Sequence, residues 1–157
     1  MLNQLIRVVA ASFLLAAAFA APESAAQQAA TITIEDPWAG TTNPGATVAA
    51  GYVTVRNTGA QPDRLLSAAS PRAARVELHE MSMSNGVMRM RPVDGIAIPA
   101  GGEATLQPGG LHIMFLEIDA QFVEGQRVPV TLRFERTGDV AVDFVARPRN
   151  RSNAHAH

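Results

Sequence analysis

Apolar and polar residues alternate in short runs along the chain from residue 31 onward, and Gly, Pro, Asn or Asp breaks most of these runs. The clearest alternation lies in 128–134 and in 74–80. A period of two is typical of strands with one buried face, and no run in this part repeats with the period of a helix. The first alternating run is 31–35, and Ser84-Asn85-Gly86 is a turn signal before the strand expected at 87–91. Turn signals recur about every 8–12 residues, which predicts an all-β sandwich of roughly eight or nine short strands.

The first part of the chain has a different pattern, which indicates an export signal. A weakly basic start, 1–7, precedes the apolar run 8–19, and Ala18-Phe19-Ala20 forms a small-x-small cleavage site. We predict a secretory signal peptide over 1–20, with the cut as late as residue 26 as the alternative. The run is shorter than the roughly 20 residues of a membrane span. We therefore expect an exported protein that is soluble outside the cytoplasm and has no membrane span in its mature form.

Composition narrows the remaining possibilities. We expect one domain over 31–146, followed by a polar, basic tail over 147–157 that has nothing to bury and is expected to be disordered. The net charge is −1, and the cut after Ala20 removes one arginine, so the charge gives no electrostatic case for nucleic acid. With no cysteine in the chain, disulfides cannot hold the fold.

Histidine and methionine gather in one window of the sequence. His79 is followed after ten residues by Met90, and twenty-one further residues separate Met90 from His112-Ile113-Met114. Five of the six methionines lie between residues 77 and 117, and the sixth is Met1. Imidazole and thioether are neutral ligands, and soft sulfur ligands favour Cu(I). The window is therefore a candidate copper site built without thiolate.

Strand alternation places these side chains opposite the predicted core. In 74–80 the apolar Val76 and Leu78 share one face and His79 takes the other. In 111–118 the apolar Ile113 and Phe115 share one face, and the opposite face carries His112 and Met114. We expect one solvent-facing metal site whose ligands are His79, Met90, His112 and Met114.

A second interpretation treats the methionines as flexible core fillers and the histidines as ordinary polar residues. For Met81, Met83 and Met88 we expect packing in the core or at its rim rather than ligation, although Met81 shares a strand face with His79 and is an accessory candidate.

The spacing of these four residues resembles the signature of the PCu(A)C copper chaperones. The similarity extends over about 31–145 and includes several further segments: 36–39 (DPWA), 50–59 (AGYVTVRNTG), 76–80 (VELHE), 86–93 (GVMRMRPV), 98–102 (IPAGG) and 108–114 (PGGLHIM). The resemblance implies a cupredoxin-like Greek-key sandwich that holds Cu(I) through His79, Met90, His112 and Met114. It also implies delivery of copper to the CuA centre of a respiratory oxidase, with an oxidase subunit and a Sco-type assembly protein as partners and with the chaperone expected to be a monomer.

Four other functions are alternatives to delivery. A purely structural secreted β-sandwich would bind no copper, so titration of the apo-protein with Cu(I) distinguishes it. An electron-transfer cupredoxin needs a cysteine thiolate, which this chain lacks. Copper buffering or resistance without directed delivery would use the same site and stays open. No nucleophile triad, His-Glu-x-x-His motif or phosphate-binding loop is present, so we expect no enzymatic activity.

The tail ends in His155-Ala156-His157, which raises a separate question. Imidazole and carboxylate oxygen suit Cu(II), so one hypothesis is a second, weaker Cu(II) site at His155 and His157. The competing hypothesis is a solvated tail that binds nothing, because compositional readings of short His-rich tracts are weak.

Overall fold

The computed structural model describes residues 31–149, so the predicted signal peptide and residues 150–157 with both tail histidines lie outside it. The described part contains ten strands, against the eight or nine expected, and the all-β prediction is confirmed. The strands are β1 (Ile32–Gly40), β2 (Val48–Asn57), β3 (Asp63–Ala69), β4 (Ala73–Ser84), β5 (Val87–Pro92), β6 (Ile96–Ile98), β7 (Glu103–Leu106), β8 (Leu111–Ile118), β9 (Arg127–Phe134) and β10 (Gly138–Arg147).

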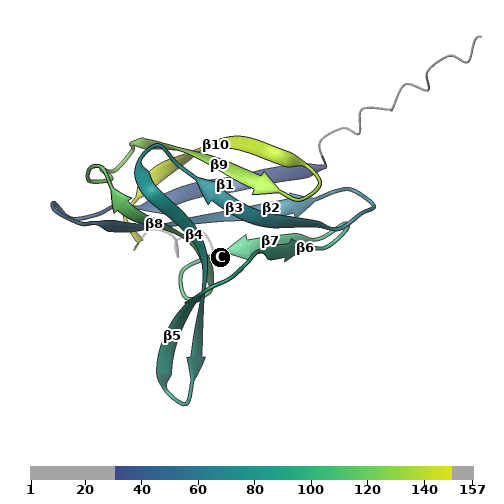
Figure 1. Ribbon diagram of the computed structural model, residues 1–157, viewed down its shortest axis with the longest axis horizontal. Helices are drawn as coiled ribbons and strands as arrows, with labels where there is room; N and C mark the ends of the chain where they lie inside the picture. The colour runs from purple at the N-terminus through teal and green to yellow at the C-terminus, as the bar shows by residue number, and fades with distance from the viewer. Residues whose placement is uncertain (1–30, 150–157) are drawn as a thin grey trace, which may run out of the picture.

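The ten strands form one continuous hydrogen-bonded network in the order β5-β4-β8-β2-β1-β10-β9-β3-β6, and β7 pairs with β2 (Figure 1). The pairing of β1 with β10 is parallel, and the others are antiparallel. One hydrophobic cluster contains Phe115 on β8, Phe134 on β9 and Phe144 on β10. Strands that are not neighbours in the sheet order therefore share the same core. The sheet therefore curves round one core, as in a sandwich.

The core packs closely enough to require glycine on β2. A Cβ added to Gly51 would lie 2.8 Å from the ring of Phe115 and 3.2 Å from that of Phe144. These two rings meet edge to face at a centroid distance of 6.5 Å. Gly51 thus lets two aromatic rings approach the backbone of the central strand.

Two buried polar side chains fix the turns. Asn57, at the end of β2, donates to the carbonyl of Gln61 at 2.8 Å and accepts from the amide of Gly59 at 2.9 Å. At the start of β3, Asp63 accepts from the amides of Arg64, Arg136 and Thr137 and from the Thr137 hydroxyl. Asp63 therefore ties β3 to the turn between β9 and β10.

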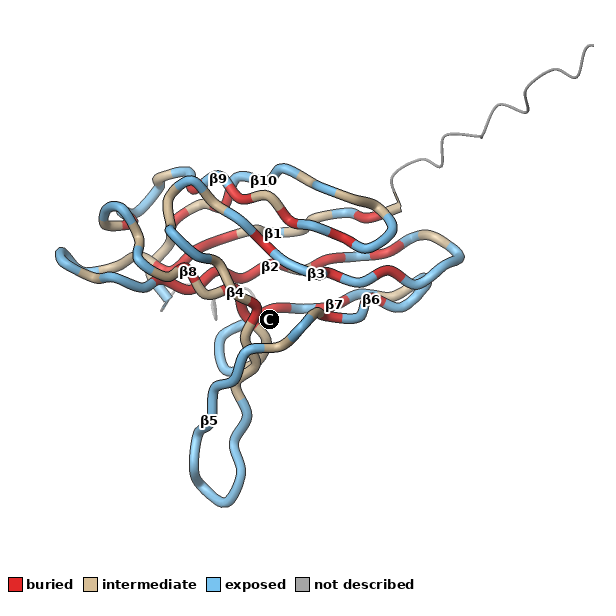
Figure 2. The backbone as a smooth tube through the Cα atoms, in the orientation of Figure 1, coloured by how far each residue is buried: buried red, intermediate tan, exposed pale blue. Residues whose placement is uncertain are grey.

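The hairpin of β4 and β5 extends away from the rest of the molecule (Figures 1 and 2). We call residues 81–90 of this hairpin the arm. Asn85 and Gly86 have φ values of +52° and +75° and form its two-residue turn, which is the backbone of the type I′ hairpin that Asn-Gly favours. The predicted turn at 84–86 is confirmed, and every residue of the arm except Met81 is exposed.

Some strand ends differ from the sequence prediction. β1 continues past Glu35 to Gly40 because a bulge between Glu35 and Trp38, with a positive φ at Asp36, absorbs the irregularity of Pro37. β10 includes Arg147, expected to begin the tail, which pairs with Gly40. Within residues 31–149 no helix is long and apolar enough to cross a membrane.

Candidate metal centre

The two histidines of the window lie directly opposite each other on neighbouring strands. His79 on β4 pairs with His112 on β8, and the ring centroids are 5.8 Å apart. Leu78 and Ile113, which are also paired, point the other way into the core. The predicted face assignment is therefore confirmed for both strands.

The strand pattern predicts a solvent-facing His112, and this prediction is wrong because the residue is buried. Its exposure is only 4%, and its ring centroid lies 6.5 Å from that of Tyr52 on β2. His112 Nδ1 donates to the carbonyl of Gly110 at 3.0 Å. Since a carbonyl can only accept, this bond puts the proton on Nδ1 and leaves the lone pair of the neutral ring on Nε2.

His79 is held by a carboxylate on its own strand. Glu77 lies two residues away on the same face, and its Oε2 is 2.8 Å from His79 Nε2. An ionised carboxylate only accepts, so Nε2 carries the proton of the neutral ring and Nδ1 carries the lone pair. His79 Nδ1 is buried and has no hydrogen-bond partner. A buried nitrogen lone pair beside a second imidazole makes His79 Nδ1 a candidate metal ligand.

Met114 takes the next position on the same face. It lies opposite Glu77 on one side and Ala50 of β2 on the other. Beyond Ala50, the buried rings of Tyr52 and Trp38 stack with centroids 4.5 Å apart. Tyr52 lies beside the imidazole of His112, and Trp38 packs on the Tyr52 ring. Burial raises the pKa of the Tyr52 phenol.

Met90 approaches the same face from β5. It pairs with Met81, one position past His79 on that side of β4, while Pro92 lies opposite His79 itself. Met90 is 48% exposed, so its thioether can move. The strand register therefore gathers all four predicted residues on one face, with Met90 at its open edge; their roles as ligands stay a prediction.

Sequence reasoning missed Glu77 and the Trp38–Tyr52 pair. Glu77 carries a signal, since it stands two residues before His79 and period two puts both on one face. Trp38 and Tyr52 carry no comparable signal, because only the pairing of β1, β2 and β8 brings Tyr52 beside His112 and Trp38 beside Tyr52.

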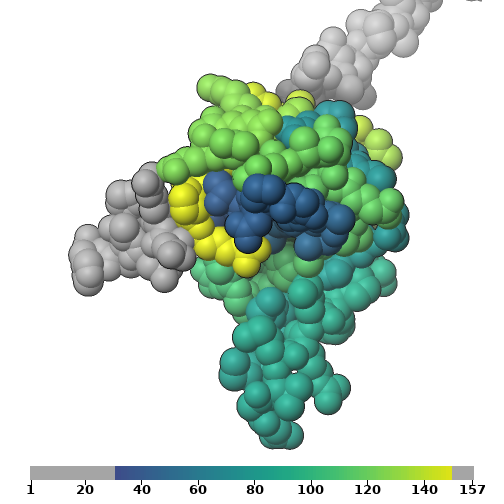
Figure 3. All heavy atoms as spheres, turned by 90° about the vertical axis from the view of Figure 1, so that its left-hand side faces the viewer, coloured from purple at the N-terminus to yellow at the C-terminus, as the bar shows by residue number. Residues whose placement is uncertain are grey.

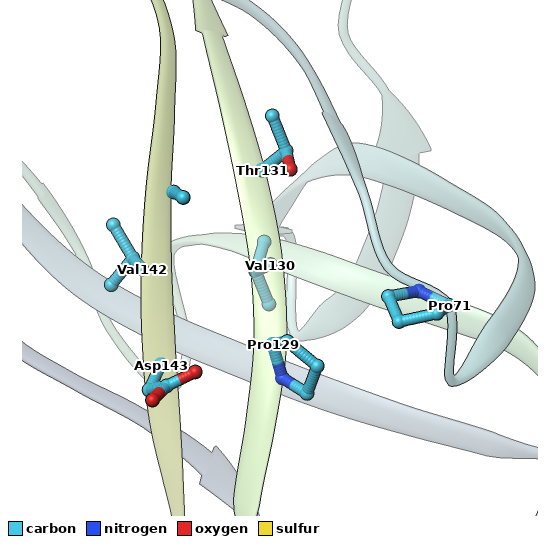
Figure 4. Close-up of a pocket in the computed structure, with 7 residues that line it drawn as sticks. Pro71, Pro129, Val130, Thr131, Val142 and Asp143 are labelled. Atoms are coloured by element: carbon cyan, nitrogen blue, oxygen red, sulfur yellow. The ribbon is translucent and has the colours of Figure 1, made fainter.

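Within residues 31–149, the His/Met face included, no three His, Cys, Asp or Glu side chains group so as to hold a metal ion, so a site on this face needs the thioethers as ligands. One surface pocket lies where β9 and β10 meet the turn at Pro71, lined by Val130, Thr131, Val142 and Asp143 among others (Figure 4). It contains neither imidazole nor thioether and belongs to other strands than the His/Met face.

The structure defines this protein as a β-sandwich with a His/Met face, and known families match the same part of the chain. Residues 32–146 match the family model described as "Putative lipoprotein LpqE-like". The chain belongs to this LpqE-like family. It is also 36% identical over 126 residues to "Putative lipoprotein Lxx21020" of Leifsonia xyli subsp. xyli, an alignment that covers 78% of this chain and 75% of the relative.

Solved structures show the same fold. The copper-bound PCuAC domain from PmoF2 matches with a TM-score of 0.65 and 30% identity over 75% of this chain and 93% of that domain. Apo-DR1885 from Deinococcus radiodurans matches with a TM-score of 0.61 and 27% identity over 92% of this chain and 97% of its own. The Cu(I) form of DR1885 matches with a TM-score of 0.57 at 28% identity. The cupredoxin-like fold is thus confirmed, and the relatives named as lipoproteins point to an exported protein.

Proposed function

We propose that this protein is a periplasmic Cu(I) metallochaperone that binds one copper ion through His79, Met90, His112 and Met114. The observation that carries the proposal is the cross-strand pair of His79 and His112, whose free nitrogens lie on the face that also bears both methionines. The solved copper forms of the PmoF2 domain and DR1885 support the choice of metal.

The donor set suits a monovalent soft ion. Two neutral imidazoles and two thioethers add no charge, so the bound ion keeps its single positive charge on a partly open face. Thioethers have no proton to lose and form no disulfides, so copper release requires neither reduction nor thiol exchange. The exposed Met90 at the edge of the site is the ligand that a receiving protein can displace first.

We propose that the ion is delivered to the CuA-type centre of a respiratory oxidase, with the oxidase subunit and a Sco-type assembly protein as partners. The role is binding and transfer by a monomer, without catalysis. Copper buffering without a dedicated recipient is the second candidate, favoured by the same open ligand set. Transfer of Cu(I) from the loaded protein to the isolated apo-CuA domain separates delivery from buffering. Delivery predicts transfer faster than the release of Cu(I) from the loaded protein to a chelator in solution.

X-ray absorption on the Cu(I)-loaded protein tests the site itself. The spectrum should show mixed nitrogen and sulfur scattering. A shell of oxygen and nitrogen alone would contradict the assignment, since both thioethers would then be absent.

The histidines at 155 and 157 lie outside the described residues, and their hypothetical Cu(II) site stays a prediction. Truncation after Ala146 is a poor test, because Arg147 pairs with Gly40 in the sheet and donates to Asp36 at 2.6 Å. The combined variant His155→Ala and His157→Ala is the better one. An unchanged Cu(II) stoichiometry in that variant would refute the tail site.

A further inference from the structure

The arm carries four methionines on one face, and none of them is in the core. Met81 pairs with Met90 and Met83 pairs with Met88. Met83 is 70% exposed and Met88 58%, so the expected packing of these two in the core or at its rim was wrong. The space-filling view shows the arm projecting from the body (Figure 3), so nothing in the described part of the chain covers its tip.

The opposite face of the arm is polar apart from Val87 near the turn. Ser82 and Arg89 face each other there, and Arg91 donates to Glu80 at 2.6 Å just below them. The arm is thus two-sided although neither side joins the core. An isolated hairpin gains little stability of its own, so a row of exposed thioethers is not explained by folding.

Strand register puts the methionine pairs in line with the candidate copper site. His79, Met81 and Met83 occupy alternate positions of β4, so they project from the same face. Side chains opposite each other in an antiparallel pair have Cβ atoms about 4.5–5.5 Å apart. Successive pairs are about 7 Å apart along the strands. Each thioether pair therefore lies within side-chain reach of the next.

The residue type is informative. Strand positions favour β-branched and aromatic residues, and such side chains would equally supply an apolar contact surface. Every position on this face of the arm is methionine instead. Methionine differs from those residues by its polarizable sulfur and its flexible, unbranched side chain, and thioether sulfur is a ligand that favours Cu(I).

We propose that Met83 and Met88 form a second, thioether-only Cu(I) site at the tip of the arm, from which the ion passes by way of Met81 to the main site. This inference rests on the proposed copper function. Transfer is a ligand exchange: one thioether–copper bond breaks as another forms, copper remains Cu(I), and no proton or electron moves. With two sulfur ligands and no imidazole, the tip site binds more weakly than the main one, which sets the direction of transfer.

Methyl NMR of the full mature chain, labelled with 13C at the methionine methyl groups, tests the proposal during stepwise anaerobic addition of Cu(I). The first equivalent should shift the signals of Met90 and Met114. The second should shift those of Met83 and Met88. Single Met→Leu variants assign the signals.

Variants then test whether the thioethers are responsible. With His155→Ala and His157→Ala in all samples, so that tail imidazoles add nothing, bound Cu(I) should fall from two ions per chain to one when Met83→Leu and Met88→Leu are combined. Val87→Leu is the matched control, since Val87 is an exposed aliphatic residue on the opposite face of the arm. It should leave both ions bound.

The outcomes separate the two proposals. If the methyl signals of Met90 and Met114 do not shift at saturating Cu(I), the main site is refuted. If the methyl signals of Met83 and Met88 do not shift, the tip site is overturned, whether or not the main site binds copper. The arm would then be an apolar surface for a protein partner. Two bound ions in the Met83→Leu, Met88→Leu variant would overturn it as well.

Discussion

His79 and His112 face each other across β4 and β8, and each ring has one nitrogen engaged by the protein and one left free. Glu77 holds Nε2 of His79, and the carbonyl of Gly110 holds Nδ1 of His112. Because opposite nitrogens are engaged in the two rings, the free atoms are Nδ1 of His79 and Nε2 of His112. The strand register thus supplies the spacing, and the hydrogen bonds supply the tautomers.

Replacing the methionine ligands should separate binding from stability. Met90 is half exposed, so Met90→Ala should change the free energy of unfolding by no more than about 0.5 kcal/mol. Met114 is partly buried, and Met114→Leu keeps its volume, so it should cost less than about 1.5 kcal/mol. Both should weaken Cu(I) binding by at least roughly tenfold through loss of a soft ligand. Urea unfolding of the apo-proteins and chelator competition measure the two effects. A loss of stability near 2–5 kcal/mol would mean that the side chains belong to the core.

Removing Glu77 should weaken copper binding without removing a ligand. Partners that orient a ligating histidine contribute about 10–100-fold in metal affinity, so Glu77→Ala should weaken Cu(I) by that factor. Glu77→Gln keeps an oxygen that can accept from His79 Nε2 and should recover much of the loss. Glu117→Ala is the control, because Glu117 also pairs with Arg75 but is exposed, and its side-chain hydrogen bond is with Arg75 rather than with a histidine. Equal losses in the Glu77 and Glu117 variants, measured by chelator competition, would show a general charge effect instead.

Asp63 should make the stability of the fold depend on acid pH. Burial alone raises the pKa of Asp63, but hydrogen bonds from Thr137, Arg136 and Arg64 outweigh it and hold this pKa below its usual range. The stabilisation is therefore complete above the unfolded pKa of about 3.9 and is lost as pH falls through the lower folded value. Asp63→Asn should cost about 2–3 kcal/mol at pH 7, and the difference from the native chain should shrink in acid.

The matched comparison for Asp63 is Asp139→Asn. The hydrogen bond from Arg133 lowers the pKa of Asp139 too, but this pair is exposed to solvent. Its removal should change stability much less than the removal of Asp63, because solvent screens an exposed ion pair. Urea unfolding at several pH values measures both variants, and equal acid responses in the two would refute the role given to Asp63.

Gly51→Ala should destabilise the core below the site. Its Cβ would meet the rings of Phe115 and Phe144, which are fully buried and cannot both retreat. Overpacking of this kind costs about 1–3 kcal/mol. Gly110→Ala, whose Cβ would meet nothing closer than 3.7 Å, should be close to neutral by thermal unfolding. A neutral Gly51→Ala would show that the rings have room to move.

The sequence by itself determined the strands and their faces. Period-two alternation made Leu78 and Ile113 core residues and put His79 and His112 on the other side, as the structure confirms. Asn85-Gly86 predicted its hairpin because only a few residues adopt the two left-handed conformations that a type I′ turn needs. These features are local, so the residues involved specify them without reference to the rest of the chain.

Only the tertiary structure decided which strands pair and in what register. β4 and β8 are separated in sequence by β5, β6 and β7, and alternation gives a face but neither a neighbour nor an offset. Pairing with β2 set His112 beside Tyr52 and buried it, and extension of β4 beyond the body left Met83 and Met88 uncovered. The physical reason is that register follows from closing one shared core, in which Phe115, Phe134 and Phe144 must all be buried together.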